Sequence, residues 1–400
     1  MRKESLGILG FDSFHFAVEN LERSRAFYTR RFDFEEIARA GHALVARSGQ
    51  VSSVFGAGDV RVCVSTPLHE SCRAARYLRR HPAGIMSLSF RVEDLDRAYR
   101  ILESRGAAIL SDPIEDRSAS GGRYRAFEIA TPLGDVAFRY VERTDYADFA
   151  PGFEPLVEHP KHNRFGIERV DHVTSNALTM QPLILFYREI LGMEEFWNIR
   201  FHTADFARSA PRKESELPDP HGAASPGTGR RAIGMWDPEG DVKFATNEPM
   251  KPYFRESQIA RFCYDNGGPG IQHLALRLPD IVGAVRDLRT RGLPFLPTHK
   301  NYYRLLPERL VRLGIRNVSH DLAALEELDI LLDGENDKYM LQIFLREAAS
   351  LYDDERAGPF FYELIERAGD QGFGYGNFRA LFEAIERDQG PERHSNSPPG

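Results

Sequence analysis

The stretch VDHVTSNALTMQPLILFYREILGMEE (Val170–Glu195) has a counterpart near the start of the chain, FDSFHFAVENLERSRAFYTRRFDFEE (Phe11–Glu36). In both, an apolar run with period-two alternation predicts a strand, and a turn and an aromatic-rich helix follow it. A histidine lies within each predicted strand, His15 in the first copy and His172 in the second. The shared rhythm indicates that the chain contains an internal repeat.

A second pair of segments repeats in the same way. MSLSFRVEDLDRAYRILESRG (Met86–Gly106) and QHLALRLPDIVGAVRDLRTRG (Gln272–Gly292) each predict a strand, a cap that contains Asp, and a helix that stops at a glycine. Together the repeats predict four strand–helix–strands modules, at residues 11–68, 85–143, 168–250 and 270–366. The predicted fold class is α+β, with two modules in each of two domains.

The length of 400 residues exceeds what one hydrophobic core usually organises, which agrees with two domains. We expect an N-terminal domain at residues 1–144 and a C-terminal domain at residues 168–388, joined by a linker rich in Pro and polar residues at 145–167. Residues 208–231 contain too much Pro, Gly and charge for a core, so we predict an exposed loop there. The tail, residues 389–400, is predicted to be disordered for the same reason.

Composition excludes several classes of function. The net charge is −7 and no block of Lys and Arg occurs, so neither a nucleic-acid partner nor an anionic membrane surface is expected. We find no signal peptide and no apolar stretch long enough to span a bilayer. Cys63, Cys72 and Cys263 form an odd set without CxxC spacing, which predicts a cytoplasmic protein without disulfides.

Three residues in the second half have the chemistry of a metal site. Strand alternation near the C-terminus puts Phe361, Glu363 and Ile365 on one face, and a carboxylate on an apolar face is costly unless it is paired or binds a metal. Two imidazoles and one carboxylate form the facial triad typical of non-haem Fe(II) oxygenases. We therefore predict that His172, His273 and Glu363 are the metal ligands and the catalytic set, with Fe(II) as the cofactor. A single strand histidine is more often a core residue, so the prediction depends on the three together.

The first half of the chain serves as a control for this prediction. Aligning the repeats matches three pairs of positions: His15 with His172, Ser87 with His273, and Arg139 with Glu363. Ser and Arg cannot complete a cation site, because Arg has no acceptor and stays charged. We therefore expect a structural His15, an N-terminal domain without metal, and an active site in the C-terminal domain.

The C-terminal stretch predicts a cover for this site. Gly372, Gly374 and Gly376 form a flexible turn, and Asn377 can cap the helix that begins there. Apolar side chains then recur at helical spacing, at Phe378, Leu381, Phe382 and Ile385. We expect this helix to close over the carboxylate.

The second half of the chain contains five distinctive motifs: VDHV (Val170–Val173), GGPGIQHLAL (Gly267–Leu276), LQIF (Leu341–Phe344), FFYELIER and GFGYGNFRALFEAIER. Together they resemble the 4-hydroxyphenylpyruvate dioxygenase family of the vicinal oxygen chelate superfamily. The resemblance covers most of the chain. It implies a glyoxalase-like fold of tandem βαβββ modules, each pair forming a cupped, barrel-like sheet. It also implies Fe(II) and the conversion of 4-hydroxyphenylpyruvate and O2 to homogentisate and CO2, a step of tyrosine catabolism. The partners would be a small-molecule arylpyruvate and O2, and the protein would be a homo-oligomer, a dimer or tetramer.

The resemblance also implies a substrate pocket. Its residues would be Asn247, Gln258, Gln272, Gln342, Phe344, Phe361, Asn377, Phe378 and Phe382. Gln272 precedes a metal ligand on one strand, so the two side chains should point to opposite faces unless a bulge intervenes. Structural roles for the amides and a plain core role for the Phe residues are the alternatives.

One departure from the family bears on specificity. Ala232 stands where the family usually has a Ser that belongs to the polar set near the substrate. Its absence removes one hydrogen bond, about 1 kcal/mol net. Preference for the para-hydroxyl is therefore open, and a related, less polar arylpyruvate is an alternative substrate.

Three other functions remain open. A 4-hydroxymandelate synthase would use the same metal and substrate but hydroxylate the benzylic carbon; the retained Phe344, Phe378 and Asn247 favour attack on the ring instead. A non-catalytic binding protein on this scaffold would not hold the metal. An extradiol ring-cleaving dioxygenase would need a further acid–base histidine, and neither His202 nor His299 lies in a supporting motif.

Overall fold

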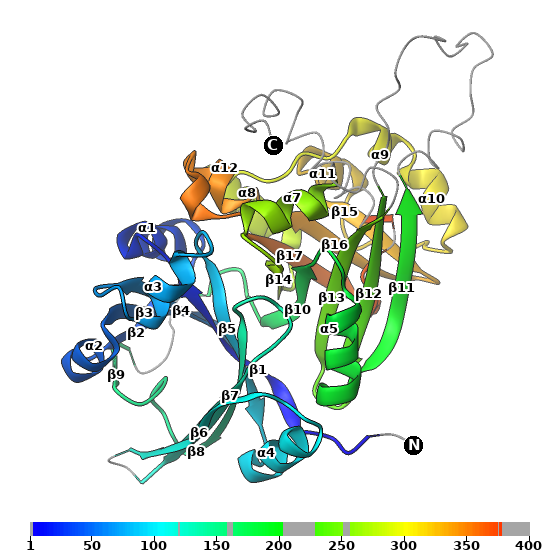
Figure 1. Cartoon of the computed structure of the whole chain (residues 1–400). Helices are drawn as coiled ribbons and strands as arrows, with labels where there is room; N and C mark the ends of the chain where they lie inside the picture. The colour runs from blue at the N-terminus through cyan, green and yellow to red at the C-terminus, as the bar shows by residue number, and fades with distance from the viewer. Residues whose placement is uncertain are drawn as a thin grey trace, which may run out of the picture.

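Two curled mixed sheets form the protein, in a computed structural model that describes residues 3–118, 121–157, 163–202, 229–250, 257–374 and 376–377. Figure 1 shows the N-terminal half, blue to cyan, beside the C-terminal half, green to red. The N-terminal sheet contains β1 (Ile8–Ala17), β2 (Glu35–Ala40), β3 (Gln50–Ala57), β4 (Val60–Pro67), β5 (Gly84–Val92), β6 (Ile109–Arg117), β7 (Arg123–Ile129), β8 (Ala137–Thr144) and β9 (Phe153–Pro155). The C-terminal sheet contains β10 (Arg169–Asn176), β11 (Glu194–His202), β12 (Gly229–Asp237), β13 (Val242–Met250), β14 (Gly270–Arg277), β15 (Leu331–Glu335), β16 (Lys338–Phe344) and β17 (Phe361–Ala368).

The strand order has the same pattern in both sheets. The orders are β6-β7-β8-β5-β1-β4-β3-β2-β9 and β11-β12-β13-β10-β14-β17-β16-β15. In each sheet an antiparallel central pair, β1·β5 or β10·β14, joins two modules, and each central strand also pairs in parallel with the last strand of its own module. The predicted fold class of tandem βαβββ modules is thereby confirmed.

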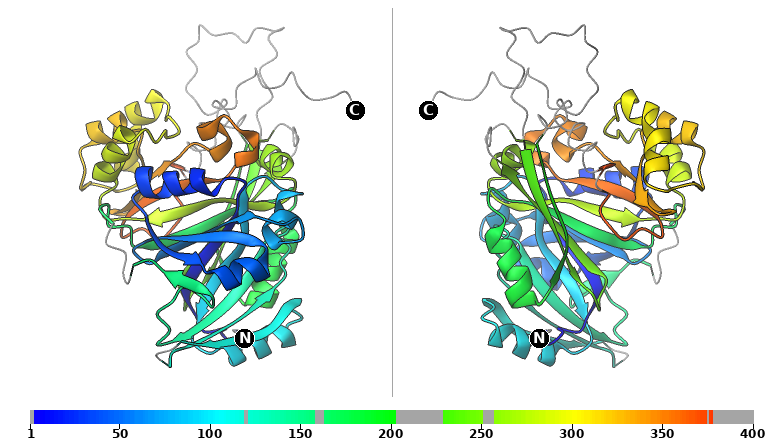
Figure 2. Two further views of the ribbon diagram at one scale, coloured as in Figure 1. Left: turned by 90° about the vertical axis from the view of Figure 1, so that its left-hand side faces the viewer. Right: turned by 90° about the vertical axis from the view of Figure 1, so that its right-hand side faces the viewer.

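Helices lie outside the sheets and connect their strands. They are α1 (Leu21–Ala26), α2 (His42–Ser48), α3 (Arg73–Leu78), α4 (Leu95–Ser104), α5 (Gln181–Leu185), α7 (Gln258–Asp265), α8 (Ile281–Thr290), α9 (Lys300–Arg304), α10 (Leu306–Arg312), α11 (Leu322–Glu327) and α12 (Ala348–Tyr352), with π turns η1 (Phe27–Arg31) and η2 (Phe186–Leu191) and a 3-10 turn η4 (Glu355–Ala357). Asp94 and Asp280 cap α4 and α8 through backbone N–H groups, as the repeat predicted. Figure 2 shows α9, α10 and α11 gathered at one edge of the molecule. No helix among the described residues combines the length and apolarity needed to cross a membrane.

Strand register corrects the predicted alignment of the repeats at one position. Ser13 pairs with Ser89 on β5, as His172 pairs with Ala275 on β14, so the counterpart of His172 is Ser13 and the match with His15 is wrong by two residues. A shift of two residues keeps every side chain on its face, and the alternation pattern therefore cannot detect it. The other two matches hold.

His15 has a structural role in the N-terminal sheet. Its Nε2 lies 2.6 Å from Ser65 Oγ. Burial, together with the charges of Arg73 and Arg139, lowers the pKa of His15 to about 3, so the ring is neutral. The position that corresponds to Glu363 holds Arg139, which pairs with Ser89 as Glu363 pairs with Ala275. The N-terminal counterparts of the three predicted ligands are Ser13, Ser87 and Arg139, and they offer no cation site.

Two predicted loop segments contain strand residues. Within residues 145–167, β9 pairs with β2 and extends the N-terminal sheet. The predicted loop 208–231 is wrong at its end, because Gly229, Arg230 and Arg231 begin β12 and pair with β13. Residues 203–228 and the tail 389–400 lie outside the described part of the chain.

Aromatic side chains join the two sheets. Phe244 on β13 is fully buried, and its ring centroid lies 5.9 Å from that of Phe11 and 5.7 Å from that of Phe138. The hydroxyls of Tyr28 in η1 and Tyr362 on β17 lie 2.8 Å apart. One hydrophobic core therefore runs through both halves.

Candidate active site

Three side chains from three adjacent strands of the C-terminal sheet meet in its interior. His172 comes from β10, His273 from β14 and Glu363 from β17. Glu363 Oε2 lies 3.5 Å from His172 Nε2 and 3.2 Å from His273 Nε2, and each residue is at most 2 % exposed. Metal–ligand bonds of about 2.1 Å at right angles separate neighbouring ligand atoms by about 3 Å, so this spacing fits one metal ion. The donor set of two imidazoles and a carboxylate fits a divalent transition metal.

A β-bulge precedes each of the two histidines. On β10, Val170 and His172 pair with consecutive residues of β14, which leaves Asp171 as the extra residue. On β14, Gln272 is skipped in the same way, between the partners of Thr174 and Ser175. The residue before each ligand therefore turns toward the ligand and does not point to the opposite face. A bulge was the one condition under which Gln272 and His273 would not point to opposite faces, and the structure contains that bulge.

The bulged residues set the tautomers of the imidazoles. His172 Nδ1 donates to Asp171 Oδ1 at 2.9 Å, and His273 Nδ1 donates to Gln272 Oε1 at 3.2 Å. Each Nε2 lone pair is left to face Glu363. Such a partner on the far nitrogen orients a metal-binding histidine and increases its basicity.

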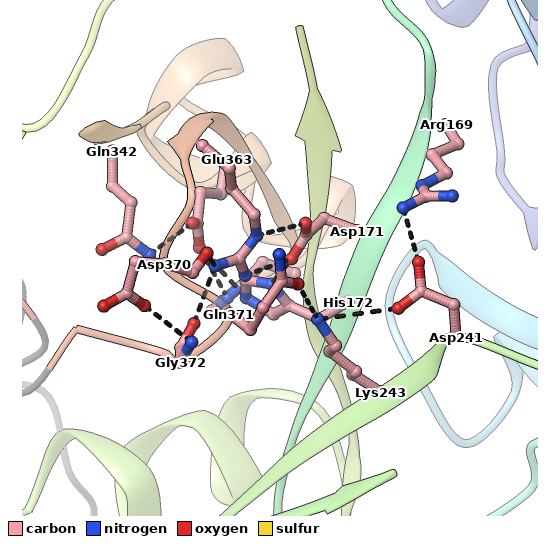
Figure 3. A network of polar contacts seen from close by, with 12 residues as sticks. Arg169, Asp171, His172, Asp241, Lys243, Gln342, Glu363, Asp370, Gln371 and Gly372 are labelled. Carbon is pink, nitrogen blue, oxygen red and sulfur yellow. Dashed lines mark hydrogen bonds and ion pairs between the residues drawn. The ribbon is translucent and has the colours of Figure 1, made fainter. Parts of the chain in front are cut away.

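Arg367 holds Asp171 in turn. Its Nε and Nη2 each donate to Asp171 at 2.6 Å, a two-pronged ion pair between side chains that are 1 % and 3 % exposed. Figure 3 shows Asp171 and His172 on one side of Glu363 and Gln342 on the other. The N-terminal sheet repeats the ion pair with Asp12 and Arg143, although the residue directly after Asp12 is Ser13 and not a histidine.

Burial and neighbouring charges shift the pKa values of His172, His273 and Glu363 in different directions. Burial alone would raise the pKa of Glu363, but the charges and hydrogen bonds of the two histidines hold it at about 2. For His172, the charge of Glu363 and the hydrogen bond to Asp171 outweigh burial, so its pKa is raised. For His273 burial prevails and lowers the pKa. Glu363 is therefore ionised at neutral pH, as a negatively charged metal ligand would have to be.

A chain of hydrogen bonds holds the other oxygen of Glu363. Gln342 Nε2 donates to Glu363 Oε1 at 2.7 Å, and Asn377 Nδ2 donates to Gln342 Oε1 at 2.9 Å. The Tyr302 hydroxyl lies 2.8 Å from Asn377 Oδ1 and 2.8 Å from the Leu332 carbonyl oxygen, and its one proton can be donated to either. Gln342, predicted as a pocket amide, thus contacts the carboxylate of Glu363 directly, and Asn377, also predicted for the pocket, is linked to it through Gln342. Tyr302 was not predicted, because nothing in its local sequence distinguishes it from a surface helix residue.

Aromatic rings surround the histidines. Phe361 stacks on His273 with centroids 4.9 Å apart, and Phe344 lies 6.0 Å from the same ring. Phe373, a residue of the glycine-rich turn that was not predicted, meets His172 edge-on at 4.8 Å. A Cβ on Gly234 would come 2.7 Å from the Phe373 ring, so this ring packs where β12 has no side chain. Phe378 and Phe382 lie outside the described residues, as does the predicted helix beyond Asn377.

Polar side chains gather farther along the same inner face. Asn247 is fully buried, and its Nδ2 donates to Asn176 Oδ1 at 2.8 Å. Arg230 Nη2 donates to Asn247 Oδ1 at 3.0 Å. Ala232 lies directly opposite Asn247, which places the departure from the family in this group.

Gln258 begins α7, a helix that packs against β13 and β10. Its side chain is 3 % exposed, and within the described part of the chain neither amide atom has a hydrogen-bond partner. A buried amide in that condition requires a partner, which a bound ligand would supply.

A second group with metal-ligand chemistry, Asp280, His320 and Glu366, has another explanation. Glu366 Oε2 accepts the backbone N–H of Ile281, and Asp280 Oδ1 accepts that of Gly283. These carboxylates cap α8, and His320 pairs with Glu366 at 2.9 Å. The group therefore caps the N-terminus of α8.

Comparisons with known proteins agree with this site. The family model of the glyoxalase/bleomycin resistance protein/dioxygenase superfamily matches residues 10–134 and 169–305. A 4-hydroxyphenylpyruvate dioxygenase of Dictyostelium discoideum is 31 % identical over 95 % of this chain and 98 % of its own length. The enzyme of that name from Danio rerio is 32 % identical over 95 % of this chain and 91 % of its own.

A solved structure extends the likeness to three dimensions. A triple mutant of 4-hydroxymandelate synthase from Streptomyces coelicolor superposes with a TM-score of 0.75 at 25 % identity, over 96 % of this chain and all of that one. Sequence and fold agree over nearly the whole length of each partner. The chain therefore belongs to the glyoxalase/bleomycin resistance protein/dioxygenase superfamily and, within it, to the 4-hydroxyphenylpyruvate dioxygenase family.

Proposed function

We propose that the protein is an Fe(II)-dependent dioxygenase that converts 4-hydroxyphenylpyruvate and O2 to homogentisate and CO2. One observation carries the proposal: in a member of this family, His172, His273 and Glu363 bring their ligand atoms within 4.8 Å of one another in a buried interior. The iron would be held by the two Nε2 atoms and by Glu363. When bound, the iron would be chelated by the keto acid of the substrate and would supply the activation of O2 at its remaining positions.

The protein's own residues would orient the metal ligands and exclude water from the site. Asp171 and Gln272 hold the Nδ1 protons, so neither imidazole can rotate away from the centre. Gln342 restrains Glu363 to one coordinating oxygen. Phe361, together with Phe344 and Phe373, excludes water from the keto-acid end, which protects reactive species from side reactions.

The ring end of the substrate would lie toward the polar group of Asn247, Gln258 and Arg230. His172 and Asn176 are four residues apart on β10, which corresponds to about 13 Å along a strand. The substrate would span that separation between the metal centre and these side chains. Gln258 gains a hydrogen-bond partner when the pocket is filled.

A 4-hydroxymandelate synthase is the second candidate, because the solved relative belongs to that class. It would share the metal centre and substrate and differ in the carbon that is hydroxylated. Phe344 is a large aromatic side chain and Asn247 is a polar one, and keeping both favours ring hydroxylation.

The deciding experiment supplies the purified protein with Fe(II), O2 and 4-hydroxyphenylpyruvate and identifies the product by mass and retention time. Homogentisate and CO2 in equal amounts are expected, and chelator-treated protein should form neither. Hydroxymandelate without homogentisate would establish the second candidate. A protein that retains no iron would instead be a binding protein on this scaffold.

Two further properties are proposed with the function. The three cysteines are buried and free, in keeping with a reducing cytoplasm. A homo-oligomer, dimer or tetramer, stays a prediction that light scattering on the purified protein will check.

A further inference from the structure

A pocket opens where the two halves of the chain meet, and none of the three predicted metal ligands lines it. Its wall comes from β1, α1, η1 and β4 of the N-terminal half and from α12, η4 and the beginning of β17 of the C-terminal half. Figure 1 shows α1 below α12 at this junction. The space that protein atoms leave free, including the part open to solvent, is about 670 Å³. Small-molecule sites usually have volumes of roughly 300 to 1,000 Å³.

Aromatic and aliphatic side chains make up most of the wall of this pocket. Phe16 on β1 meets Phe360 edge-on, with ring centroids 4.9 Å apart, so rings of both halves form one surface. Phe361 also lines the pocket, and its ring stacks on His273. Aromatic rings pair favourably in edge-on and offset-stacked arrangements. The wall therefore suits a ligand with an apolar, aromatic body.

Two tyrosine hydroxyls in the wall have one proton more than they use. Tyr28 Oη and Tyr362 Oη lie 2.8 Å apart, and the two residues are 5 % and 3 % exposed. Burial raises the pKa of both hydroxyls, so each keeps its proton at neutral pH. One proton forms the bond between the two oxygens, and the other has no acceptor within the described part of the chain. A buried donor without an acceptor is costly, and an oxygen atom of a ligand would satisfy it.

The charged residues of the wall are both positive. Arg23 and Arg346 line the pocket, whereas no Asp or Glu does. Arg23 lies over the ring of Tyr352 and donates to Asp354 at 2.5 Å, which uses one of the five N–H groups of the guanidinium. The lining therefore favours an anionic head group over a cationic one.

We propose that this pocket is a second ligand site, which binds a small aromatic carboxylic acid. The ring of the acid lies among the aromatic side chains, and a carboxylate oxygen accepts the unused proton of the Tyr28–Tyr362 pair. The site does not depend on the proposed function, because binding there requires neither metal nor O2. Through Phe361, which stacks on His273, the bound acid lies one side chain away from the metal centre.

Titration calorimetry with 2-naphthylacetate tests the site, and 2-naphthylethylamine, a cation with the same ring, is the contrasting ligand. The acid should bind at least about tenfold more tightly than the amine, and with the same affinity in iron-loaded and chelator-treated protein. The double variant Tyr28→Phe/Tyr362→Phe removes both hydroxyls and keeps both rings. It should weaken binding of the acid at least about tenfold, because a hydrogen bond to a charged group is lost.

Ala348→Trp shows whether the acid lies in this pocket. Ala348 is the first residue of α12 and lines the pocket, so an indole there would fill the space. This variant should abolish binding of the acid. Ala349→Trp is the matched control, because Ala349 is the next residue of the same helix and does not line the pocket. It should bind the acid as tightly as the parent protein does.

An acid bound between His172, His273 and Glu363 would not respond to these changes. Unaltered binding in Ala348→Trp or in the tyrosine double variant, with each folded by circular dichroism, therefore overturns the proposal. A parent protein that does not prefer the acid to the amine overturns it as well. If the ligands and variants behave as expected while no arylpyruvate is turned over, the proposed function is wrong and the second site stands.

Discussion

Glu363 contacts both imidazoles through one oxygen and Gln342 through the other. Removing it takes away the negative ligand and leaves two neutral nitrogens. Glu363→Ala or His273→Ala should therefore lose stoichiometric iron and reduce turnover to background, a larger loss than the ~10- to 100-fold caused by changing a residue that only orients a ligand. Elemental analysis and O2 uptake measure the two effects.

His15→Ala is the control for these variants, because His15 is a strand histidine with a structural partner in the other sheet. It should keep iron and activity. Full activity in Glu363→Ala would show that the metal is held elsewhere.

Protons compete with the metal at His172. Its pKa is raised above 6.5 in the metal-free protein, so its Nε2 becomes protonated as the pH falls through that raised value, and apparent metal affinity should fall with it. The ion pair that forms, protonated His172 with ionised Glu363, stabilises the metal-free fold. Its His172 contribution is present below pH 6.5 and is lost as the pH rises through the raised pKa. The Glu363 contribution is present above 4.5 and is lost as the pH falls toward about 2.

Denaturant titrations of metal-free and iron-loaded protein between pH 4.5 and 9 measure this linkage. The metal-free protein should become less stable toward high pH, whereas stabilisation by a fixed metal concentration should increase. A metal affinity independent of pH in this range would mean that His172 is not a ligand.

At the level of elements, the two bulges of the central strand pair position the site. The N-terminal sheet contains the corresponding bulge and ion pair, at Asp12 and Arg143, with Ser13 where the other sheet has His172. Asp171→Asn and Asp12→Asn should both destabilise the fold, by about 3 kcal/mol for the more deeply buried Asp171 pair and less for Asp12. Only Asp171→Asn should also weaken metal binding, about 10- to 100-fold. Equal metal affinity in both variants would show that Asp171 acts on the fold alone.

These bulges also show which features of the site could not be predicted from the sequence. Alternation and spacing identify His172, His273 and Glu363, since each is chemically out of place on an apolar strand. They do not reveal that Asp171 and Gln272 leave the ladder, because a bulge depends on the register of a partner strand distant in sequence. For the same reason His15 was aligned with His172, and Arg230 was placed in a loop: its neighbours are polar, and only pairing with β13 turns it inward.

At the level of the whole molecule, the aromatic interface between the sheets should make the chain one cooperative unit. Phe244 contacts rings of both halves, including Tyr187 at 4.9 Å and Phe138 at 5.7 Å. If the N-terminal sheet unfolded alone, this core would be exposed to water. The N-terminal half should thus stabilise the C-terminal half, which holds the three proposed metal ligands.

Phe244→Ala should therefore lower the free energy of unfolding by about 3 to 5 kcal/mol, the usual cost of emptying a fully buried aromatic site. Both tryptophans, Trp197 and Trp236, lie in the C-terminal sheet, so their fluorescence follows that half while circular dichroism follows the whole chain. In the parent protein the two urea transitions should coincide. Tyr264→Ala, at a position 57 % exposed, should change stability by less than about 0.5 kcal/mol. Separate transitions in the parent protein would mean that the halves fold independently and that the shared aromatic core does not couple them.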